Sequence, residues 1–163
     1  MKSLDKKICN WDELSKNIQI YQSKGKKIVF TNGCFDLIHT GHTRYLQEAR
    51  LAGDFLVVAL NSDQSVSQLK GPKRPIIPLI ERMEIMAGFS FVDFVTSFEE
   101  LDPARIIESL KPDILIKGGD WPVEKIIGRD FVESNGGQVY TIPEIPGRST
   151  SEIINKIVRL YKS

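Results

Sequence analysis

The sequence is poor in histidine, in cysteine and in long apolar segments. Its 163 residues include two histidines and two cysteines, and no apolar run approaches the roughly 20 residues that a membrane-spanning helix needs. The first residues lack the apolar core of a secretory signal, so we expect a cytoplasmic protein. Cys9 and Cys34 have neither a CxxC spacing nor histidines placed to complete a zinc site, which predicts two reduced thiols.

A strong excess of charge of either sign is also absent. The chain carries 22 Lys and Arg against 21 Asp and Glu, a net charge of +1. This balance excludes a strong general attraction to nucleic acid, and neither nucleic acid nor a membrane is expected as a partner. Any anionic ligand must therefore meet a local cluster of positive charge. No residues have a spacing that suggests a covalent nucleophile, and Cys34 is interpreted as a small core residue.

Expected strands and helices alternate along the chain. Strands are expected at 26–32, 55–61, 92–96, 113–116 and 138–142. Helices are expected at 11–25, 41–52, 78–89, 103–110, 122–134 and 149–161, and a mobile loop at 65–78. Such alternation predicts a parallel sheet whose ligands bind at the carboxyl ends of the strands. The fold class is therefore α/β, a doubly wound Rossmann-like parallel sheet in a single domain over 26–163, after an N-terminal helical extension over 1–25.

Both histidines fall in one short stretch, FTNGCFDLIHTGH, at residues 30–42. His39 and His42 follow the first expected strand and open the next helix, where free backbone N–H groups attract phosphate. Gly41 lets the backbone approach a ligand closely, and both imidazoles can donate hydrogen bonds to phosphate oxygens. In the alternative, His42 caps the helix and His39 is an ordinary loop residue. The position between strand and helix favours the phosphate site.

This stretch resembles the first signature of the H-x-G-H nucleotidylyltransferases, the cytidylyltransferase-like superfamily. Three more stretches match in the same order: RPIIPLIERM at 74–83, KGGDW at 117–121 and GRSTSEII at 147–154. Within the superfamily the chain is most similar, over 26–160, to heptose 1-phosphate adenylyltransferases, without the sugar-kinase domain often fused to them. The resemblance therefore implies a stand-alone enzyme that transfers AMP from ATP to D-glycero-D-manno-heptose 1-phosphate.

In the implied reaction the acceptor phosphate attacks the α-phosphorus of ATP directly, and pyrophosphate leaves. Such a reaction depends on positioning and on charge stabilisation. Mg²⁺ is expected to accompany the triphosphate, and the family makes a homodimer plausible. Two alternatives stay open: a cytidylyltransferase for glycerol 3-phosphate or another phosphorylated alcohol, and a nucleotide-binding regulator without turnover. The base is read by backbone groups in such sites, so the side chains do not decide between ATP and CTP.

The resemblance also assigns roles to residues. Those implied to be catalytic are His39, His42, Lys70 and Arg148. Those implied to bind the nucleotide are the two histidines with Thr31, Asn32, Gly33, Phe35, Gly41, Gly118, Asp120, Ser149, Thr150 and Ser151. Those implied to bind the acceptor are Asp36, Lys70, Lys73, Arg74, Arg82, Lys117, Gly119 and Trp121. No side chains are expected to hold a metal.

Several of these residues also have structural interpretations. Asp36 can hold its loop as a turn or cap residue, and Arg82 can form a surface ion pair with Glu81 or Glu84. The basic segment at 70–74 can be a solvated loop, and the glycines at 118–119 a plain turn. Trp121 can serve ordinary packing instead of stacking on a ring. A cap role at 149–150 is compatible with phosphate binding, because a helix N-terminus rich in hydroxyls also binds phosphate.

Overall fold

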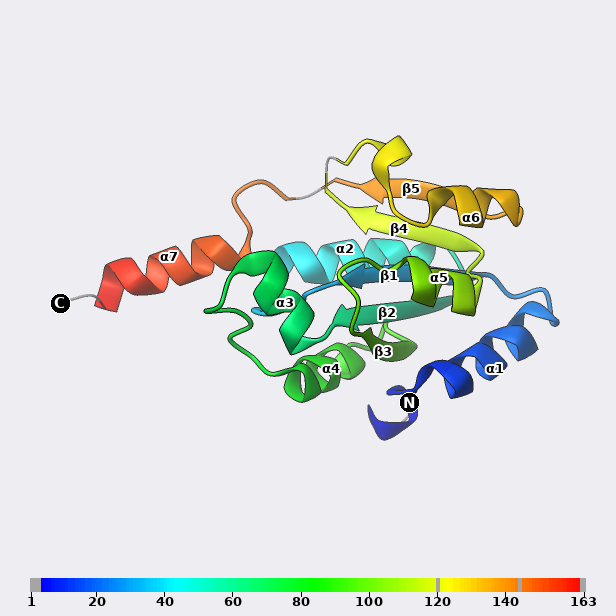
Figure 1. Cartoon of the computed structure of the whole chain (residues 1–163), viewed down its shortest axis with the longest axis horizontal. Helices are drawn as coiled ribbons and strands as arrows, with labels where there is room; N and C mark the ends of the chain where they lie inside the picture. Colours follow the sequence, from blue (N-terminus) through cyan, green and yellow to red (C-terminus); the bar gives the residue numbers. More distant parts are fainter. Residues whose placement is uncertain (1–3, 120, 144, 162–163) are drawn as a thin grey trace.

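Five parallel strands form one sheet in the computed structural model, which describes residues 4–119, 121–143 and 145–161. The strand order is β3-β2-β1-β4-β5 (Figure 1). The strands are β1 (Ile28–Gly33), β2 (Phe55–Asn61), β3 (Phe94–Phe98), β4 (Ile114–Gly118) and β5 (Gln138–Ile142). The order reverses between β1 and β4, since β2 and β3 lie on one side of β1 while β4 and β5 lie on the other. This arrangement confirms the predicted doubly wound parallel sheet.

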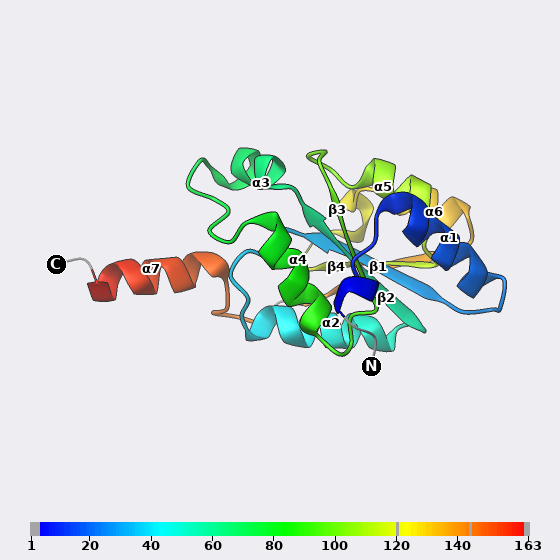
Figure 2. The same cartoon turned by 90° about the horizontal axis from the view of Figure 1, so that it is seen from below.

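Helices cover both faces of this sheet, as Figure 2 shows from a second direction. On one face lie α1 (Trp11–Gln22), α5 (Ala104–Leu110) and α6 (Arg129–Ser134), which pack on the sheet through one core cluster. On the other lie α2 (Thr40–Leu51) and α4 (Leu79–Gly88), which share the second cluster. The central strands are apolar and buried nearly throughout because both faces are covered.

Helix α1 belongs to the same core as the sheet. Its Leu14 and Ile18, four residues apart on one helix face, are fully buried against β1 and α5. Asn10 caps the helix by accepting a hydrogen bond from the Glu13 N–H at 2.9 Å. The helical extension predicted for 1–25 therefore packs against the body of the fold, and its standing as a separate unit stays a prediction.

Several expected elements differ from the observed ones, including β1, which begins two residues later than expected, and β4, which ends two residues later. The segment expected to be a mobile loop from residue 65 contains α3 (Asp63–Lys70), which Ser62 caps by accepting from the Ser65 N–H. Strand β3 begins two residues later than expected, because Asp93 uses its carboxylate to bind the Leu56 N–H at the start of β2. The helical stretch expected at 122–134 is divided into η2 (Val123–Lys125) and α6, since Gly128 between them has a φ of 91°. A short 3₁₀ turn, η1 (Leu4–Lys6), precedes α1.

The last helix, α7 (Thr150–Tyr161), leaves the body of the molecule near the carboxyl ends of the strands (Figures 1 and 2). None of its residues is buried, and Ile157, Val158 and Leu160 are about half exposed or more. Among the described residues no helix is both long enough and apolar enough to span a bilayer.

Candidate active site

A cavity of about 570 Å³ lies at the carboxyl ends of β1 and β4, where the strand order reverses. Its lining includes Asn32 to Phe35, at the end of β1 and in the loop that follows, and Lys117 and Gly118 at the end of β4. The amino ends of α2 and α7 reach its rim with His39, His42 and the serine and threonine residues at 149–151. In doubly wound sheets this crevice is the usual place for a ligand.

The two histidines form a stacked pair at the amino end of α2. Their ring centroids lie 3.8 Å apart at an interplanar angle of 26°. His39, and not His42 as in the alternative, occupies the N-cap position, and its side chain makes no cap bond, while His42 lies inside the first turn of α2. A Cβ atom at Gly41 would lie 2.8 Å from His39 Nδ1. Glycine is therefore required here because the His39 ring lies over the first turn of α2.

The His42 ring is held between its neighbour and Phe35, whose ring meets it edge-on at 5.3 Å. Burial, together with the nearby His39, lowers the pKa of His42 from 6.5 to about 4. Its Nδ1 is buried and has no hydrogen-bond partner among the described residues. A buried nitrogen of this kind is normally hydrogen-bonded in a folded protein, which distinguishes the Nδ1 of His42 from most buried polar atoms.

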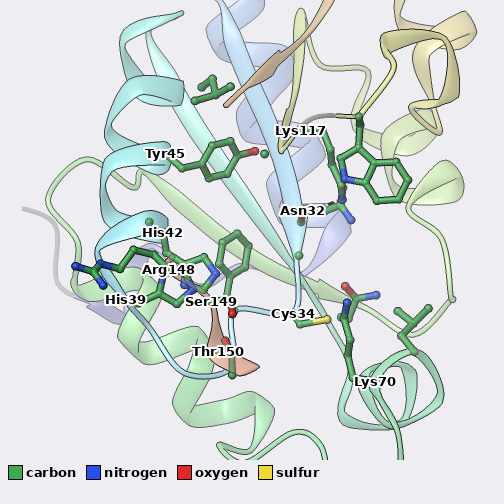
Figure 3. A pocket seen from close by; sticks show the side chains of 18 of the residues that line it. Asn32, Cys34, His39, His42, Tyr45, Lys70, Lys117, Arg148, Ser149 and Thr150 are labelled. Atoms are coloured by element: carbon green, nitrogen blue, oxygen red, sulfur yellow. Dashed lines mark hydrogen bonds between the residues drawn. The ribbon is translucent and has the colours of Figure 1, made fainter. Parts of the chain in front are cut away.

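Positive side chains line the same cavity. Lys70, Lys117 and Arg148 form no ion pair with any described residue. The Lys117 ammonium lies 3.3 Å from the Asn32 carbonyl and 3.4 Å from its Oδ1, and burial together with Lys70 lowers the pKa of Lys117. In Figure 3 Arg148 lies beside the histidines, while Lys70 and Lys117 lie on the other side of Cys34. Such a set of unpaired cations suits an anion with several charges.

The amino end of α7 adds a second helix terminus to the cavity. Ser149 Oγ accepts a hydrogen bond from the Glu152 N–H at 3.1 Å, which is the predicted cap. The Thr150 hydroxyl donates to the Leu37 carbonyl at 3.1 Å and so ties α7 to the loop that leads into α2. Both hydroxyl groups and Ser151 also line the cavity. The two helix termini therefore direct partial positive charge toward one space.

Most residues predicted for the site line this cavity, and sequence reasoning missed several others. The predicted ones are His39, His42, Lys70, Arg148, Asn32, Gly33, Phe35, Gly41, Gly118, Ser149, Thr150, Ser151, Arg74, Lys117 and Trp121. The missed ones are Cys34, Tyr45, Asn61, Leu69, Leu101, Pro103, Lys125, Ile126, Ile127, Ile142, Pro143 and Ile145. Several of the missed residues lie at or just after strand ends, a position that the predicted topology could have indicated.

Cys34 is one of these missed residues, because it lines the cavity instead of filling the core as expected. Burial raises the pKa of its thiol although four cations nearby oppose the change. The protonated thiol is a poor nucleophile, which agrees with the expectation that the chemistry does not pass through Cys34.

Arg82 is a correction to the sequence analysis. It was expected to grip a phosphate, or else to pair at the surface with Glu81 or Glu84, but the side chain is fully buried. Its guanidinium donates to the carbonyls of Ile77 at 2.9 Å, Cys34 at 2.6 Å and Asn61 at 2.9 Å, and it pairs with Asp63 at 2.6 Å. The reason is its place on the face of α4 that packs on the sheet, so Arg82 joins segments of the protein below the cavity.

Asp36 is also corrected from a ligand to a structural group. Its side chain is fully buried, it does not line the cavity, and it forms an ion pair with Arg74. It also accepts hydrogen bonds from the N–H groups of Ile76 and Ile77, each at 2.9 Å. Burial by itself would raise the pKa of Asp36, but these donors and Arg74 outweigh it and lower that pKa. The interpretation of Asp36 as the residue that holds the loop is therefore the correct one.

Three of the remaining predicted residues do not line the cavity. Thr31 is buried inside β1, where its hydroxyl shares a hydrogen bond with the Tyr45 hydroxyl beneath the site. Gly119 is buried and its N–H donates to the Ile142 carbonyl at 2.9 Å, which continues the pairing of β4 with β5. Lys73 is exposed and does not reach the cavity wall. Asp120 lies outside the described residues.

The protein is therefore of the doubly wound α/β class, with two helix termini, a stacked imidazole pair and cations that form no ion pair with a described residue around one crevice, features typical of sites for phosphorylated ligands. The sequence gives the family directly: residues 30–156 match the model of the cytidylyltransferase-like family, and the chain belongs to that family.

Curated relatives match the chain over almost its whole length. A protein named bifunctional protein HldE from Citrifermentans bemidjiense is 53% identical over 160 residues, which are 98% of this chain and 33% of that protein. The protein of the same name from Geobacter metallireducens is 53% identical over 157 residues, covering 96% and 32% of the two chains. The chain therefore spans about a third of the length of these relatives.

Solved structures share the fold. The lipopolysaccharide core biosynthesis protein from Thermoplasma volcanium is 28% identical with a TM-score of 0.59, covering 74% of this chain and 98% of that one. Pantothenate synthetase from Thermus thermophilus is 15% identical with a TM-score of 0.57, covering 85% of this chain and 62% of that one. The second likeness concerns the fold alone.

Proposed function

We propose that this chain transfers AMP from ATP to D-glycero-D-manno-heptose 1-phosphate, which gives ADP-heptose and pyrophosphate. The observation that carries the proposal is the stacked pair of His39 and His42, which shares one cavity with the amino end of α7 and with unpaired cations. ATP and a sugar phosphate together bring a triphosphate and a further phosphate into one space. The helix termini and cations favour that charge, and they favour it most where it grows during phosphoryl transfer.

The proposed chemistry is a direct displacement at phosphorus. An oxygen of the acceptor phosphate forms a bond to the α-phosphorus, while the bond from that phosphorus to the oxygen bridging to the β-phosphate breaks. The electron pair leaves with pyrophosphate. Because the acceptor oxygen is already anionic, the reaction needs no general base, and the task of the protein is to orient the two substrates.

The residues divide this task by position. His39 and His42 donate to the α-phosphate region, where negative charge increases in the transition state. Arg148 and the amino end of α7 hold the phosphates that leave as pyrophosphate. Lys70 and Lys117, across the cavity, hold the phosphate of the acceptor and bring it in line with the bond that breaks.

Mg²⁺ is proposed to enter with the triphosphate. The described residues contain no group of three or more His, Cys, Asp or Glu side chains that could hold a metal ion. Phosphate oxygens and water are common ligands of Mg²⁺ in such sites. No step of the proposed reaction is assigned to the ion.

The choice of substrates rests on the resemblance of the four signatures to heptose 1-phosphate adenylyltransferases. The relatives named HldE support it at 53% identity, and the neighbour described as a lipopolysaccharide core biosynthesis protein agrees with it. We place the reaction in the cytoplasm because ATP is supplied there. Transfer of CMP from CTP to glycerol 3-phosphate is the alternative that the experiment below separates.

A homodimer is proposed as the working assembly. The six large apolar residues of α7 lie on one side of the helix and are half-buried or exposed, and a second copy of the chain would remove this surface from water. Sedimentation velocity at increasing protein concentration tests the proposal, with Ile157→Glu as the variant expected to be monomeric. A wild-type protein that stays monomeric at every concentration contradicts it.

The proposed reaction is tested by measuring pyrophosphate release with ATP or CTP against heptose 1-phosphate or glycerol 3-phosphate. We expect ATP with heptose 1-phosphate to give the highest kcat/KM, and CTP with glycerol 3-phosphate to be slower by at least about 100-fold, equal to ~2.7 kcal/mol. A preference for CTP would contradict the heptose assignment and leave nucleotidylyl transfer in place. Binding of ATP without turnover of any pair would indicate the regulator instead.

A further inference from the structure

Two buried charged side chains connect the loop that follows β1 with the segment at 74–77. Asp36 comes from the loop after β1, and Arg82 comes from α4. Their exposed fractions are 1% and 0%. Neither lines the cavity, and the proposed reaction gives neither of them a contact with substrate. Buried charges need compensating partners, and the hydrogen-bond partners of Asp36 and Arg82 include groups in both segments.

Asp36 binds the segment at 74–77 by accepting hydrogen bonds from its donors. The carboxylate accepts from the N–H groups of Ile76 and Ile77 and from Nε of Arg74. Arg82 binds the same segment by donating to the Ile77 carbonyl. It also donates to the Cys34 carbonyl in the loop that follows β1. The two segments are therefore fastened to each other at several points, and their relative position is fixed before any ligand binds.

Arg74 is the member of this network that reaches the cavity. Its side chain is 13% exposed, and its Nε is the atom that Asp36 binds. A guanidinium has five N–H donors in a rigid plane, so a carboxylate on Nε fixes the plane while the terminal nitrogens stay available for a ligand. Without Asp36 the same cation would remain near the cavity, but in many orientations.

We propose that Asp36 is a positioning residue that acts through Arg74, fixing the guanidinium so that it binds the phosphate of the acceptor. The proposal rests on the proposed function, since it requires an anionic acceptor on this side of the cavity. Arg82 supports the arrangement by holding the Ile77 carbonyl and the Cys34 carbonyl together. The nucleotide should depend little on Asp36, because the histidines and the amino end of α7 bind it elsewhere.

A double-mutant cycle of Asp36→Asn and Arg74→Gln tests this inference. Asp36→Asn should raise KM for the acceptor about tenfold, because the guanidinium is no longer aimed, and should change the Kd of ATP by less than about twofold. In the Arg74→Gln background the same change should leave the acceptor KM within about twofold. If the two effects multiply independently, or if Asp36→Asn alters ATP binding and stability but not the acceptor KM, the proposal is wrong.

Two further variants keep the test decisive. Arg74→Lys retains the charge but loses the planar contact with Asp36, so the acceptor KM should rise about tenfold, as in Asp36→Asn. This variant also serves if Asp36→Asn fails to fold. An unchanged acceptor KM overturns the proposal. Asp113→Asn is the matched control, because Asp113 also accepts a backbone N–H and pairs with a cation, but at the opposite edge of the sheet. If the wild-type protein releases no pyrophosphate, the proposed function fails separately, and the same cycle is measured on the Kd of inorganic phosphate, with the same non-additivity expected.

Discussion

The two edges of the parallel sheet differ in whether three of their positively charged side chains are paired with carboxylates. At the amino edge, each of three cations has a carboxylate partner: Lys26 with Asp54 at 3.0 Å, Lys27 with Asp113 at 2.9 Å and Arg50 with Asp93 at 2.7 Å. At the carboxyl edge, Lys70, Lys117 and Arg148 line a cavity without an ion-pair partner among the described residues. The chain is almost neutral as a whole, so this separation is a matter of placement.

The aspartates of the amino edge have a shared structural task. Asp54, Asp93 and Asp113 each precede a strand, and each accepts the N–H of a residue at the start of the neighbouring strand. Hydrogen bonds from the Lys27 N–H and the Lys26 ammonium lower the pKa of Asp54, and those from Ile28, Gln22 and Lys27 outweigh burial to lower that of Asp113. These three aspartates therefore neutralise Lys26, Lys27 and Arg50 and help to fix the register of the sheet.

At the carboxyl edge, two of the described carboxylates pair with arginines and not with Lys70, Lys117 or Arg148. Asp36 is used to hold Arg74 and the backbone at 76–77, and Asp63 to hold Arg82. The two histidine rings are half-buried and stacked, and His42 is neutral near pH 7, so the adjacent rings do not carry two like charges. Three cations without an ion-pair partner among the described residues therefore line one cavity at the carboxyl edge.

The largest effect is expected at the histidine pair. His39→Ala and His42→Ala should each lower kcat by about 100-fold or more, with a smaller change in KM for ATP, because donors that act mainly in the transition state affect turnover most. Steady-state pyrophosphate release measures this. An unchanged kcat in either variant would remove that histidine from the mechanism.

A matched pair of lysines compares the two edges directly. Lys117→Met at the carboxyl edge should raise KM for the acceptor about tenfold, since a half-buried cation that lines the cavity is lost. Lys27→Met at the amino edge should leave both KM values unchanged and cost at most about 1 kcal/mol of stability, because its ion pair is largely exposed. Equal changes of KM in the two variants would contradict the claim that the two edges differ in their role in substrate binding.

A smaller effect is expected at the amino end of α7. The double substitution Ser149→Ala with Thr150→Ala should weaken ATP binding and lower the free energy of unfolding by about 1 kcal/mol, because the cap of α7 and the bond to Leu37 are both lost. Calorimetric titration and urea denaturation measure the two quantities. A loss of stability with normal ATP binding would mean that the segment serves only as a cap.

The smallest effect concerns pH. Because the pKa of His42 is about 4 in the folded protein and 6.5 is its ordinary value, the unfolded chain binds more protons between these values. The free energy of unfolding should therefore fall as the pH is lowered from about 6.5 to about 4, and it should fall less in His42→Asn. Protonation of the amino-edge aspartates with lowered pKa values, Asp54 and Asp113, destabilises the fold only at lower pH. Urea denaturation at pH 7 and pH 5 distinguishes the two edges, and an equal loss in both proteins would contradict the assignment to His42.

The central parts of the fold could be predicted because their sequence is consistent at every level. Strands β1 and β2 are apolar runs bounded by polar residues, and α1 has a cap and an apolar stripe. Helix α3 was missed because its eight residues offer only Val66 as a buried apolar side chain, and tertiary contacts rather than periodicity hold it. The start of β3 depends on a side-chain bond of Asp93 to another strand, which no local pattern shows.

In the site, position could be predicted better than orientation. The motifs correctly indicated which loops meet, since the carboxyl ends of parallel strands share one edge. They could not indicate that Asp36 and Arg82 turn away from the cavity, because both have the residue types that bind phosphates or metals elsewhere. One signal was available for Arg82: it lies four residues before Met86, on the face of α4 that is buried.

The most direct test of the central claim is to map nucleotide binding by ¹H–¹⁵N NMR, with a non-hydrolysable ATP analogue titrated into the wild-type protein. The account predicts chemical-shift changes at the carboxyl edge, in residues 32–42, 117–119 and 148–151, and nearly unchanged signals at the amino edge, in residues 26–28, 54, 93 and 113. Shift changes centred on the amino edge, or spread equally over both edges, would contradict the claim that only the carboxyl edge is built to bind phosphates.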